Sequence, residues 1–338
     1  MTVFYQFFIY LVSLVFINSF LIKNNLLIDS PLIDKHKKKI FFSQKVPKSL
    51  GLIIFLFVVL NLNFDIYELY LIFFIFFLGI LSDVKKLNSP KLRFLFQSII
   101  VFSFLIYSGD LIQGTKVPFI DYLLKFQFFS IGLTLFCILI VVNGSNFIDG
   151  LNTLCLGYYL SLAIILLFFQ INTSYQFDSI YLFVCVLVLL YFYNFLGKSF
   201  LGDSGSYLLG FLFSILLIDI HVSKLSISPW FIAVLLWYPA FEILFSIIRR
   251  ASQSKNPFLP DNRHFHQLLY LYFKKKFNLK TALINPLIAN IINLYNFLSF
   301  YLAYSYYNFS IVMIIIFFFN CFTYLILYLI LHKNISKY

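Results

Sequence analysis

Charged residues are scarce in this sequence, because they make up 11% of its 338 residues and only 13 residues are acidic. Hydrophobic residues make up 62% of the chain, and 47 residues are phenylalanine. A water-soluble domain carries a much larger charged fraction, so this composition excludes that class. The apolar runs are also far longer than the alternating segments of a membrane β-barrel. The sequence therefore predicts an all-α membrane protein, whose helices satisfy their own backbone groups.

Cysteine is scarce as well, and its four copies lie singly in or beside apolar runs, at Cys137, Cys155, Cys185 and Cys321. A metal or redox site made by cysteine needs close pairing, which this spacing does not provide. We therefore interpret these cysteines as packing residues. The sequence contains no internal repeat and no separate soluble segment, so it predicts a single transmembrane domain over residues 1–338.

The apolar runs predict about eleven membrane-spanning helices, since a helix needs roughly 20 apolar residues to cross the hydrocarbon layer. The predicted spans lie near 3–22, 49–63, 66–81, 94–108, 127–143, 153–171, 178–194, 205–220, 228–247, 282–305 and 309–331. The shorter runs are expected to use polar flanks or to break near functional loops. The first run lacks a basic n-region and a cleavage site, so it is expected to be a retained helix.

Basic residues follow alternate apolar runs, and they give the chain a net charge of +12. The segment after the first run is rich in lysine, and the positive-inside rule predicts that it is cytoplasmic. The N-terminus is then outside and the C-terminus inside, with cytoplasmic loops near 23–48, 82–93, 144–152, 195–204 and 248–281. Topology and anionic lipid head groups account for the net charge, so no nucleic-acid partner is expected.

Four polar constellations fall on this predicted cytoplasmic side. They are GILSDVKKLNSPKLRFLFQ at 79–97, NGSNFIDGLNTL at 143–154, GKSFLGDSGSYLLGF at 197–211 and RRASQSKNPFLPDNRHFHQLL at 249–269. Acidic residues at a membrane edge are costly, which makes them candidates for function. Three of them, Asp83, Asp149 and Asp203, each follow an apolar run. We expect the four segments to form one site.

The residue types in these segments suit phosphoryl transfer. Oxygen ligands from Asp203, with Asn146 or Asp149, suit a hard divalent cation such as Mg²⁺. The glycines around Asp203 would let the backbone approach a phosphate, and a helix beginning near Ser206 would point its positive end at that phosphate. The candidate phosphate-binding groups are Lys85, Lys198, Arg249, Arg250, Arg263, His264 and His266. Alone, each motif is typical of a loop turn or a topology signal, and their co-occurrence favours a site.

The motifs NFIDGLN, GDSGSYLLGF and PDNRHFH resemble those of the polyprenyl-phosphate N-acetylhexosamine-1-phosphate transferases of glycosyltransferase family 4, and the resemblance covers roughly residues 50–270. The resemblance implies a multi-pass enzyme of the bacterial plasma membrane with ten or eleven helices and a cytoplasmic active site. The implied reaction transfers a sugar-1-phosphate from a UDP-N-acetylhexosamine to a polyprenyl phosphate such as undecaprenyl phosphate and releases UMP. It requires Mg²⁺, with Mn²⁺ as an alternative, and it initiates a cell-envelope glycan such as the O-antigen of lipopolysaccharide. A homodimer is left open.

The resemblance also implies roles for individual residues. Asp203 would bind Mg²⁺ with help from Asn146, and Asp149 would belong to the nucleotide-binding loop. The basic loop with Arg263 would contact the sugar diphosphate and influence the choice of sugar. The expected site comprises the catalytic residues Asp83, Asp149 and Asp203, the metal ligands Asp203 and Asn146, and the substrate-binding residues Lys85, Asn143, Asn152, Lys198, Arg263, His264 and His266.

Two positions depart from the pattern of that family. Ser82 precedes Asp83 where many members have adjacent aspartates, and Gln267 replaces a final histidine. The lipid phosphate has a second pKa of about 6, so Asp83 would only position it or finish its deprotonation. A two-step route through an aspartyl-phosphate stays open. The alternatives are a non-catalytic relative, because of Ser82, and a membrane transporter or lipid-handling protein, which would carry mid-span ionisable groups and inverted repeats.

Overall fold

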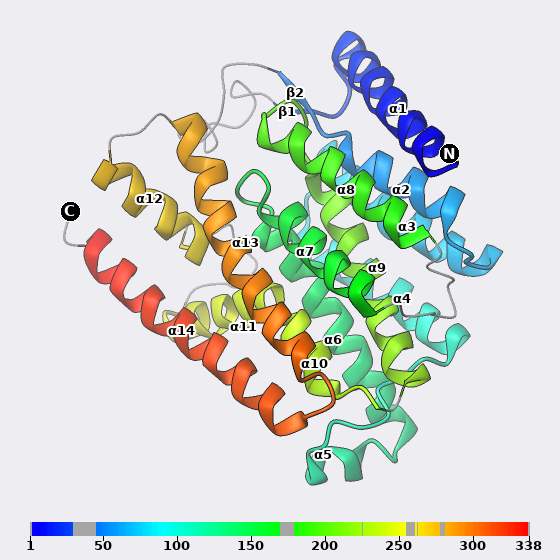
Figure 1. The fold of residues 1–338 in the computed structure, drawn as a ribbon, viewed down its shortest axis with the longest axis vertical. Coiled ribbons are helices and arrows are strands. Elements are labelled where there is room, and N and C mark those ends of the chain that lie inside the picture. The colour runs from blue at the N-terminus through cyan, green and yellow to red at the C-terminus, as the bar shows by residue number, and fades with distance from the viewer. Residues whose placement is uncertain are drawn as a thin grey trace.

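The computed structural model describes residues 2–29, 45–169, 179–224, 226–254, 261, 263–277 and 281–336. The helices of the first half are α1 (Thr2–Asn24), α2 (Leu50–Asn61), α3 (Ile66–Asp83), α4 (Pro90–Ser108), α5 (Pro118–Leu123), α6 (Gln127–Ile148) and α7 (Leu154–Phe169). Those of the second half are α8 (Ile180–Phe195), α9 (Gly202–Ser223), α10 (Pro229–Leu235), α11 (Trp237–Ser252), α12 (Phe265–Phe277), α13 (Thr281–Ser305) and α14 (Ser310–Ser336). Two short strands, β1 (Ile28–Asp29) and β2 (Val46–Pro47), pair antiparallel. Within these ranges the fold is otherwise helices and connecting loops (Figure 1).

Seven helices of the described ranges are long and apolar enough to cross a membrane: α1, α3, α4, α6, α9, α13 and α14. The pair α10 and α11 makes an eighth span if it is counted as one. Three further apolar helices, α2, α7 and α8, are shorter. The prediction of an all-α polytopic membrane protein is confirmed, whereas the predicted count of eleven crossings is not.

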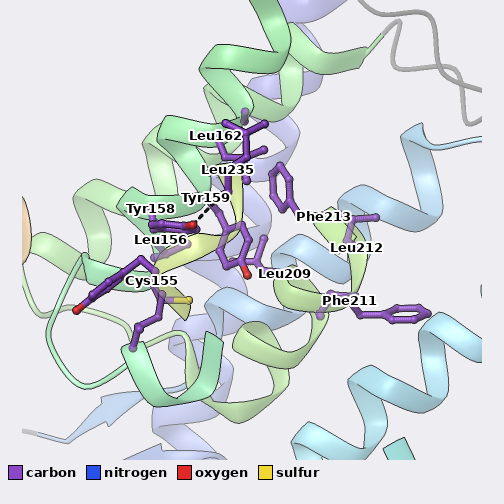
Figure 2. Packing of buried hydrophobic residues seen from close by; sticks show 14 of the residues in the cluster. Cys155, Leu156, Tyr158, Tyr159, Leu162, Leu209, Phe211, Leu212, Phe213 and Leu235 are labelled. Carbon is purple, nitrogen blue, oxygen red and sulfur yellow. Dashed lines mark hydrogen bonds between the residues drawn. The ribbon is translucent and has the colours of Figure 1, made fainter. Parts of the chain in front are cut away.

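The predicted span 228–247 is two helices, since α10 and α11 meet at an angle of 73°. Proline has no N–H, so Pro239 cannot donate to the carbonyl of Leu235, four residues earlier, and its ring disfavours a continuous helix there. The Leu235 carbonyl instead accepts a hydrogen bond of 2.6 Å from the hydroxyl of Tyr158 on α7 (Figure 2). A side chain from another helix therefore supplies the hydrogen bond that this carbonyl lacks at the break.

Two loop predictions need correction. The predicted loop 248–281 contains the helix α12, while its parts at 255–260, 262 and 278–280 lie outside the described residues, as does 30–44 of the loop 23–48. The helix expected to begin near Ser206 begins at Gly202, whose φ of 73° turns the chain into α9. Asp203 consequently lies in the first helical turn.

Helix α9 is the centre of the bundle, because α2, α3 and α6 pack against it and nearly all of its residues are buried. Close approach needs small residues: a Cβ added to Gly51 on α2 would lie 2.6 Å from the backbone N of Gly205. Further along α9, the side chains of Phe211 and Phe213 are fully buried in the core (Figure 2). By contrast α1 and α14, at the edges in Figure 1, expose many large apolar side chains, as lipid-facing helices do.

Candidate active site

A cavity of about 150 Å³ lies at the N-terminal end of α9. It is lined by Asp29, Lys48, Asn146, Asp149, Gly150, Leu151, Asn152, Asn194, Phe200, Leu201, Gly202 and Asp203. These residues come from four separate segments of the chain, including the predicted motifs around Asp149 and Asp203. Three carboxylates and one lysine therefore share one small polar space.

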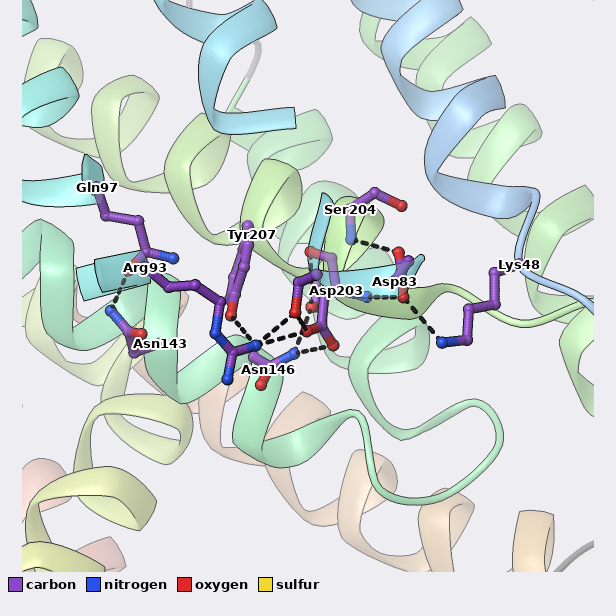
Figure 3. Close-up of polar contacts among 11 residues, drawn as sticks. Lys48, Asp83, Arg93, Gln97, Asn143, Asn146, Asp203, Ser204 and Tyr207 are labelled. Atoms are coloured by element: carbon purple, nitrogen blue, oxygen red, sulfur yellow. Dashed lines mark hydrogen bonds and ion pairs between the residues drawn. The ribbon is translucent and has the colours of Figure 1, made fainter. Parts of the chain in front are cut away.

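Asp203 is held at this cavity by three side chains (Figure 3). Its Oδ1 accepts a hydrogen bond of 2.7 Å from Asn146 Nδ2, and its Oδ2 accepts one of 2.9 Å from Arg93 Nη1. The Ser82 hydroxyl donates to the same Oδ2. The side chain keeps 28% of its surface exposed. Asp203 also lies in the first turn of α9, where the positive end of the helix dipole favours a negative charge.

Arg93 and Ser82 form a second layer behind Asp203. Arg93 Nη1 donates to Ser82 Oγ at 2.5 Å and to the Tyr207 hydroxyl at 3.3 Å. Ser82 thus accepts from a guanidinium and donates to a carboxylate. A carboxylate at position 82 would face Asp203 directly, whereas the hydroxyl adds a hydrogen bond without adding a second negative charge.

Asp83 has a different environment from Asp203, because its side chain is 0% exposed and does not line the cavity. Oδ1 accepts from Lys48 Nζ at 3.0 Å and from the backbone N–H of Asp203 at 3.1 Å. Oδ2 accepts from the backbone N–H of Ser204 at 3.0 Å. A Cβ at Gly202 would lie 2.7 Å from this Oδ2. Asp83 therefore caps the N-terminus of α9, although it belongs to α3.

Lys48 is the only lysine or arginine among the described residues that line the cavity. Burial by itself lowers the pKa of its amino group, but the nearby carboxylates, chiefly Asp83, raise that pKa above its usual value. The ammonium is thus charged near neutral pH. It carries three N–H groups, and the bond to Asp83 uses one of them.

The Asp149 loop forms the opposite wall. Asp149 follows the last residue of α6, and both Asp149 and Asn152 line the cavity. The backbone N–H of Asn152 donates to Asn285 Oδ1 at 2.8 Å, while the side-chain nitrogen of Asn152 has no partner in the described structure. This amide is a donor available at the cavity.

The histidine segment lies behind the Asp149 loop and does not line the cavity. His264 is buried, and its Nδ1 lies 3.0 Å from Glu242 Oε1. His266 is fully buried with its ring against Gly150, and burial lowers its pKa to about 3. Arg263 is exposed, and its carbonyl accepts from the Tyr328 hydroxyl at 3.2 Å. The segment supports the loop in this structure, and its expected contact with a sugar diphosphate stays a prediction.

Three more of the predicted substrate-binding residues, besides Arg263, His264 and His266, lie outside the cavity lining. Lys85 and Lys198 are exposed, and Asn143 donates to Gln97 Oε1 at 2.9 Å (Figure 3). Sequence reasoning missed the site positions of Lys48 and Arg93. Lys48 lies in the lysine-rich segment that the positive-inside rule explains, so the sequence did not distinguish it from its neighbours. Arg93 offered a usable signal, because a cation near the start of a helix is unfavourable unless a partner offsets it.

The donor set can be compared with the needs of a divalent cation. Among the described residues no three His, Cys, Asp or Glu side chains cluster as a complete metal site. Mg²⁺ commonly uses one or two carboxylates and takes its other ligands from water and substrate phosphates. Asp203, Asp149 and Asn146 line the same cavity and supply such oxygens. The residues fit a magnesium ion that arrives with a phosphate ligand.

Residues 66–221 match the family model described as glycosyl transferase family 4. A probable undecaprenyl-phosphate N-acetylglucosaminyl 1-phosphate transferase of Bacillus subtilis is 32% identical over 199 residues, which cover 58% of this chain and 55% of the relative. An undecaprenyl-phosphate alpha-N-acetylglucosaminyl 1-phosphate transferase of Escherichia coli O157:H7 is 26% identical over 271 residues, covering 68% of this chain and 72% of the relative. The chain thus spans about half the length of the Bacillus relative. The matched residues include Asp83, Asn146 and Asp203, so the part of the chain that carries the cavity is similar to glycosyl transferase family 4.

Proposed function

We propose that the protein transfers N-acetylhexosamine-1-phosphate from a UDP-sugar to a polyprenyl phosphate, such as undecaprenyl phosphate, and releases UMP. The observation that carries the proposal is the Asp203 carboxylate, which lies in the first turn of α9 at a cavity that also contains Lys48 and Asp149. The names of the relatives support the lipid acceptor and favour N-acetylglucosamine as the sugar. The product would begin a lipid-linked glycan of the cell envelope.

The cavity offers a binding mode for the diphosphate. The first turn of α9 gives a positive helix end, and Lys48 gives a cation on the same wall. Asp203, Asn146 and Asp149 would hold Mg²⁺, or Mn²⁺ in its place, and the ion would neutralise charge on the diphosphate oxygens. The unpartnered amide nitrogen of Asn152 would donate to an acceptor of the nucleotide.

The reaction needs little proton transfer. An oxygen of the lipid phosphate forms a bond to the sugar-linked phosphorus, the bridging P–O bond breaks, and UMP leaves with the electron pair. Because a phosphate monoester has a second pKa of about 6, the attacking group is mostly ionised at neutral pH. Asp83 is buried, and both of its oxygens accept hydrogen bonds, so in this proposal it positions α9 and Lys48.

We further propose that the cavity faces the cytoplasm of a bacterial plasma membrane, with the N-terminus outside. The alternation of basic segments along the sequence supports this orientation. A cytoplasmic cavity would have access to a soluble nucleotide sugar. The lipid acceptor would remain in the membrane, which surrounds the exposed apolar helices.

The proposal is tested with membranes that contain the protein, undecaprenyl phosphate and each of a panel of UDP-sugars. Formation of UMP together with a sugar-diphosphate lipid is the expected result, and the Asp203→Asn variant is the matched control. Wild-type protein that forms neither product with any UDP-N-acetylhexosamine would contradict the proposal. Equal product from the Asp203→Asn membranes would assign the activity to another enzyme.

A further inference from the structure

The chain adopts a costly conformation directly after Asn152. Thr153 has a φ of 70°, in the left-handed region, although it is β-branched. Such a residue keeps this conformation only where the surroundings hold it firmly, and residues of this kind concentrate at functional sites. Thr153 joins the Asp149 loop of the cavity to α7. The groups that hold it are therefore relevant to the cavity.

Three asparagine side chains hold the backbone on both sides of this point. Asn194 Oδ1 on α8 accepts from the N–H of Thr153 at 2.5 Å. On α13, Asn285 Oδ1 accepts from the N–H of Asn152 at 2.8 Å, and Asn293 Nδ2 donates to the carbonyl of Thr153 at 2.9 Å. All three side chains are buried. We name Asn194, Asn285 and Asn293 the asparagine clamp.

The close approach of α13 depends on a glycine in α7. A Cβ added to Gly157 would lie 3.0 Å from Asn293 Cγ and still closer to its amide nitrogen. Helix α7 follows the loop directly, and the missing side chain of Gly157 makes room for Asn293. The clamp residue Asn293 is built into the packing of α7 against α13.

Asn194 also connects the loop to the other walls of the cavity. Its Nδ2 donates to the carbonyl of Ser199 at 2.9 Å, just before the segment that enters α9. The Ser199 hydroxyl donates to the carbonyl of Pro47 at 3.0 Å, next to Lys48. One buried series of hydrogen bonds thus joins the Asp149 loop, the segment before Asp203 and the segment of Lys48.

The side-chain nitrogen of Asn152 is a buried donor of this loop that has no partner in the described part of the chain. Asn152 is 4% exposed and lines the cavity. Its backbone is fixed by Asn285, while its side-chain donor has no acceptor among the residues that the structure describes. A donor fixed in this way is arranged for an acceptor oxygen of a ligand.

We infer that the asparagine clamp positions the Asn152 amide for binding the nucleotide part of the donor substrate. The inference rests on the proposed function. It also assigns a role in the site to α13, which lies beyond the residues 66–221 that match the family model. The clamp residues act through Asn152 and Thr153, so they are positioning residues and not catalytic ones.

A matched pair of isosteric substitutions tests the geometry. Asn285→Asp keeps the acceptor oxygen that Asn152 uses, whereas Asn293→Asp replaces the donor to the Thr153 carbonyl with an oxygen. UMP binding to the purified full-length protein is measured by calorimetry. Asn293→Asp is expected to weaken UMP binding about tenfold, as when a hydrogen bond that fixes a binding group is lost, while Asn285→Asp stays within about threefold of wild type. Equal UMP affinity of Asn293→Asp and wild type would overturn the inference.

A second comparison separates positioning from general packing. Asn296 on α13 is also fully buried, but its Oδ1 accepts from Trp237 Nε1 at 2.9 Å, away from the loop. Asn285→Leu and Asn296→Leu should lower the melting temperature to a similar extent. Only Asn285→Leu should weaken UMP binding and raise KM for the UDP-sugar, with KM for the lipid phosphate unchanged. Equal losses of UMP binding in both variants would show a packing role alone.

The same measurements distinguish the inference from the proposed function. Wild-type protein that neither binds UMP nor forms the lipid product would remove the proposed function. Wild-type protein that does both, together with an unaffected Asn293→Asp variant, would remove only the role of the clamp.

Discussion

The carboxylate of Asp83 caps the helix that carries Asp203: Asp83 Oδ1 accepts a hydrogen bond of 3.1 Å from the backbone N–H of Asp203. The two residues are adjacent in space but have different environments. Asp203 is partly exposed at the cavity, whereas the Asp83 side chain is fully buried and also holds Lys48. The Asp83 carboxylate accepts hydrogen bonds from Lys48 and from two backbone N–H groups at the start of α9, and hydrogen bonds to a charged group are strong. Substitutions at the two positions should therefore have different consequences.

Asp83→Asn should lower the transfer rate by on the order of a hundredfold or more, a size typical of losing a well-placed polar group at an active site. One of its two oxygens becomes an NH₂ group, which cannot accept from the amides at the start of α9. Since Asp83 is a cap in our proposal, the shape of the rate against pH should stay as in wild type. A lost limb of the pH profile would instead identify Asp83 as the titrating base, and full activity would remove it from the mechanism.

Asp203→Asn should nearly abolish transfer while the protein remains folded. The change removes the carboxylate that faces the cavity and leaves α9 capped by Asp83. Mg²⁺ should raise the melting temperature of the wild type, because an ion that binds the folded state stabilises it, and this increase should be absent in the variant. Asp65→Asn, at the exposed N-cap of α3, is the control. An unchanged Mg²⁺ titration in Asp203→Asn would reject the metal assignment.

Ser82→Asp should change the rate by less than the effect of Asp83→Asn. A new carboxylate would face Asp203, but Arg93 lies within hydrogen-bonding distance of both positions and offsets part of the repulsion. The rate is measured against pH for wild type, Ser82→Asp and Ser82→Ala. If the native protein were inactive and Ser82→Asp restored activity, the chain would be a non-catalytic relative.

Lys48→Met should raise KM for at least one phosphate substrate by about tenfold, the effect of losing a charged contact to a bound anion. Separate titrations of UDP-sugar and lipid phosphate show which substrate Lys48 contacts, and Lys48→Arg should keep part of the binding. The double variant with Asp83→Asn is the informative comparison. If Lys48 served only to neutralise Asp83, the double variant would recover the loss that Lys48→Met causes.

The orientation of the chain can be tested by cysteine labelling. Ser254, exposed after α11, should react only from the cytoplasmic side when it is replaced by cysteine. The exposed Cys185 is replaced by serine in the background. Labelling of position 254 by an impermeant reagent on intact cells would contradict the predicted topology, and with it the cytoplasmic cavity.

Composition and hydropathy were enough to predict the fold class and the approximate positions of the helices. In a membrane, apolar runs with few charges satisfy their backbone groups by forming α-helices, and each predicted run overlaps a helix or a helix pair. The polar motifs also marked the segments of the cavity, because Asp149 and Asp203 are polar groups in an otherwise apolar chain. Local composition was sufficient for these results.

The pairing of the polar residues follows from the packing of the helices and could not be predicted from the sequence. Arg93 meets Asp203, 110 positions away, and Asn293 meets Thr153, 140 positions away. Such contacts depend on which helix faces pack together, and periodicity along the chain carries no information about them. The break between α10 and α11 has a local cause in Pro239, yet the Leu235 carbonyl at the break accepts its hydrogen bond from Tyr158 of a distant helix. For the same reason the sequence could name Asp83 and Asp203 together, while only packing separated a buried helix cap from the carboxylate that faces the cavity.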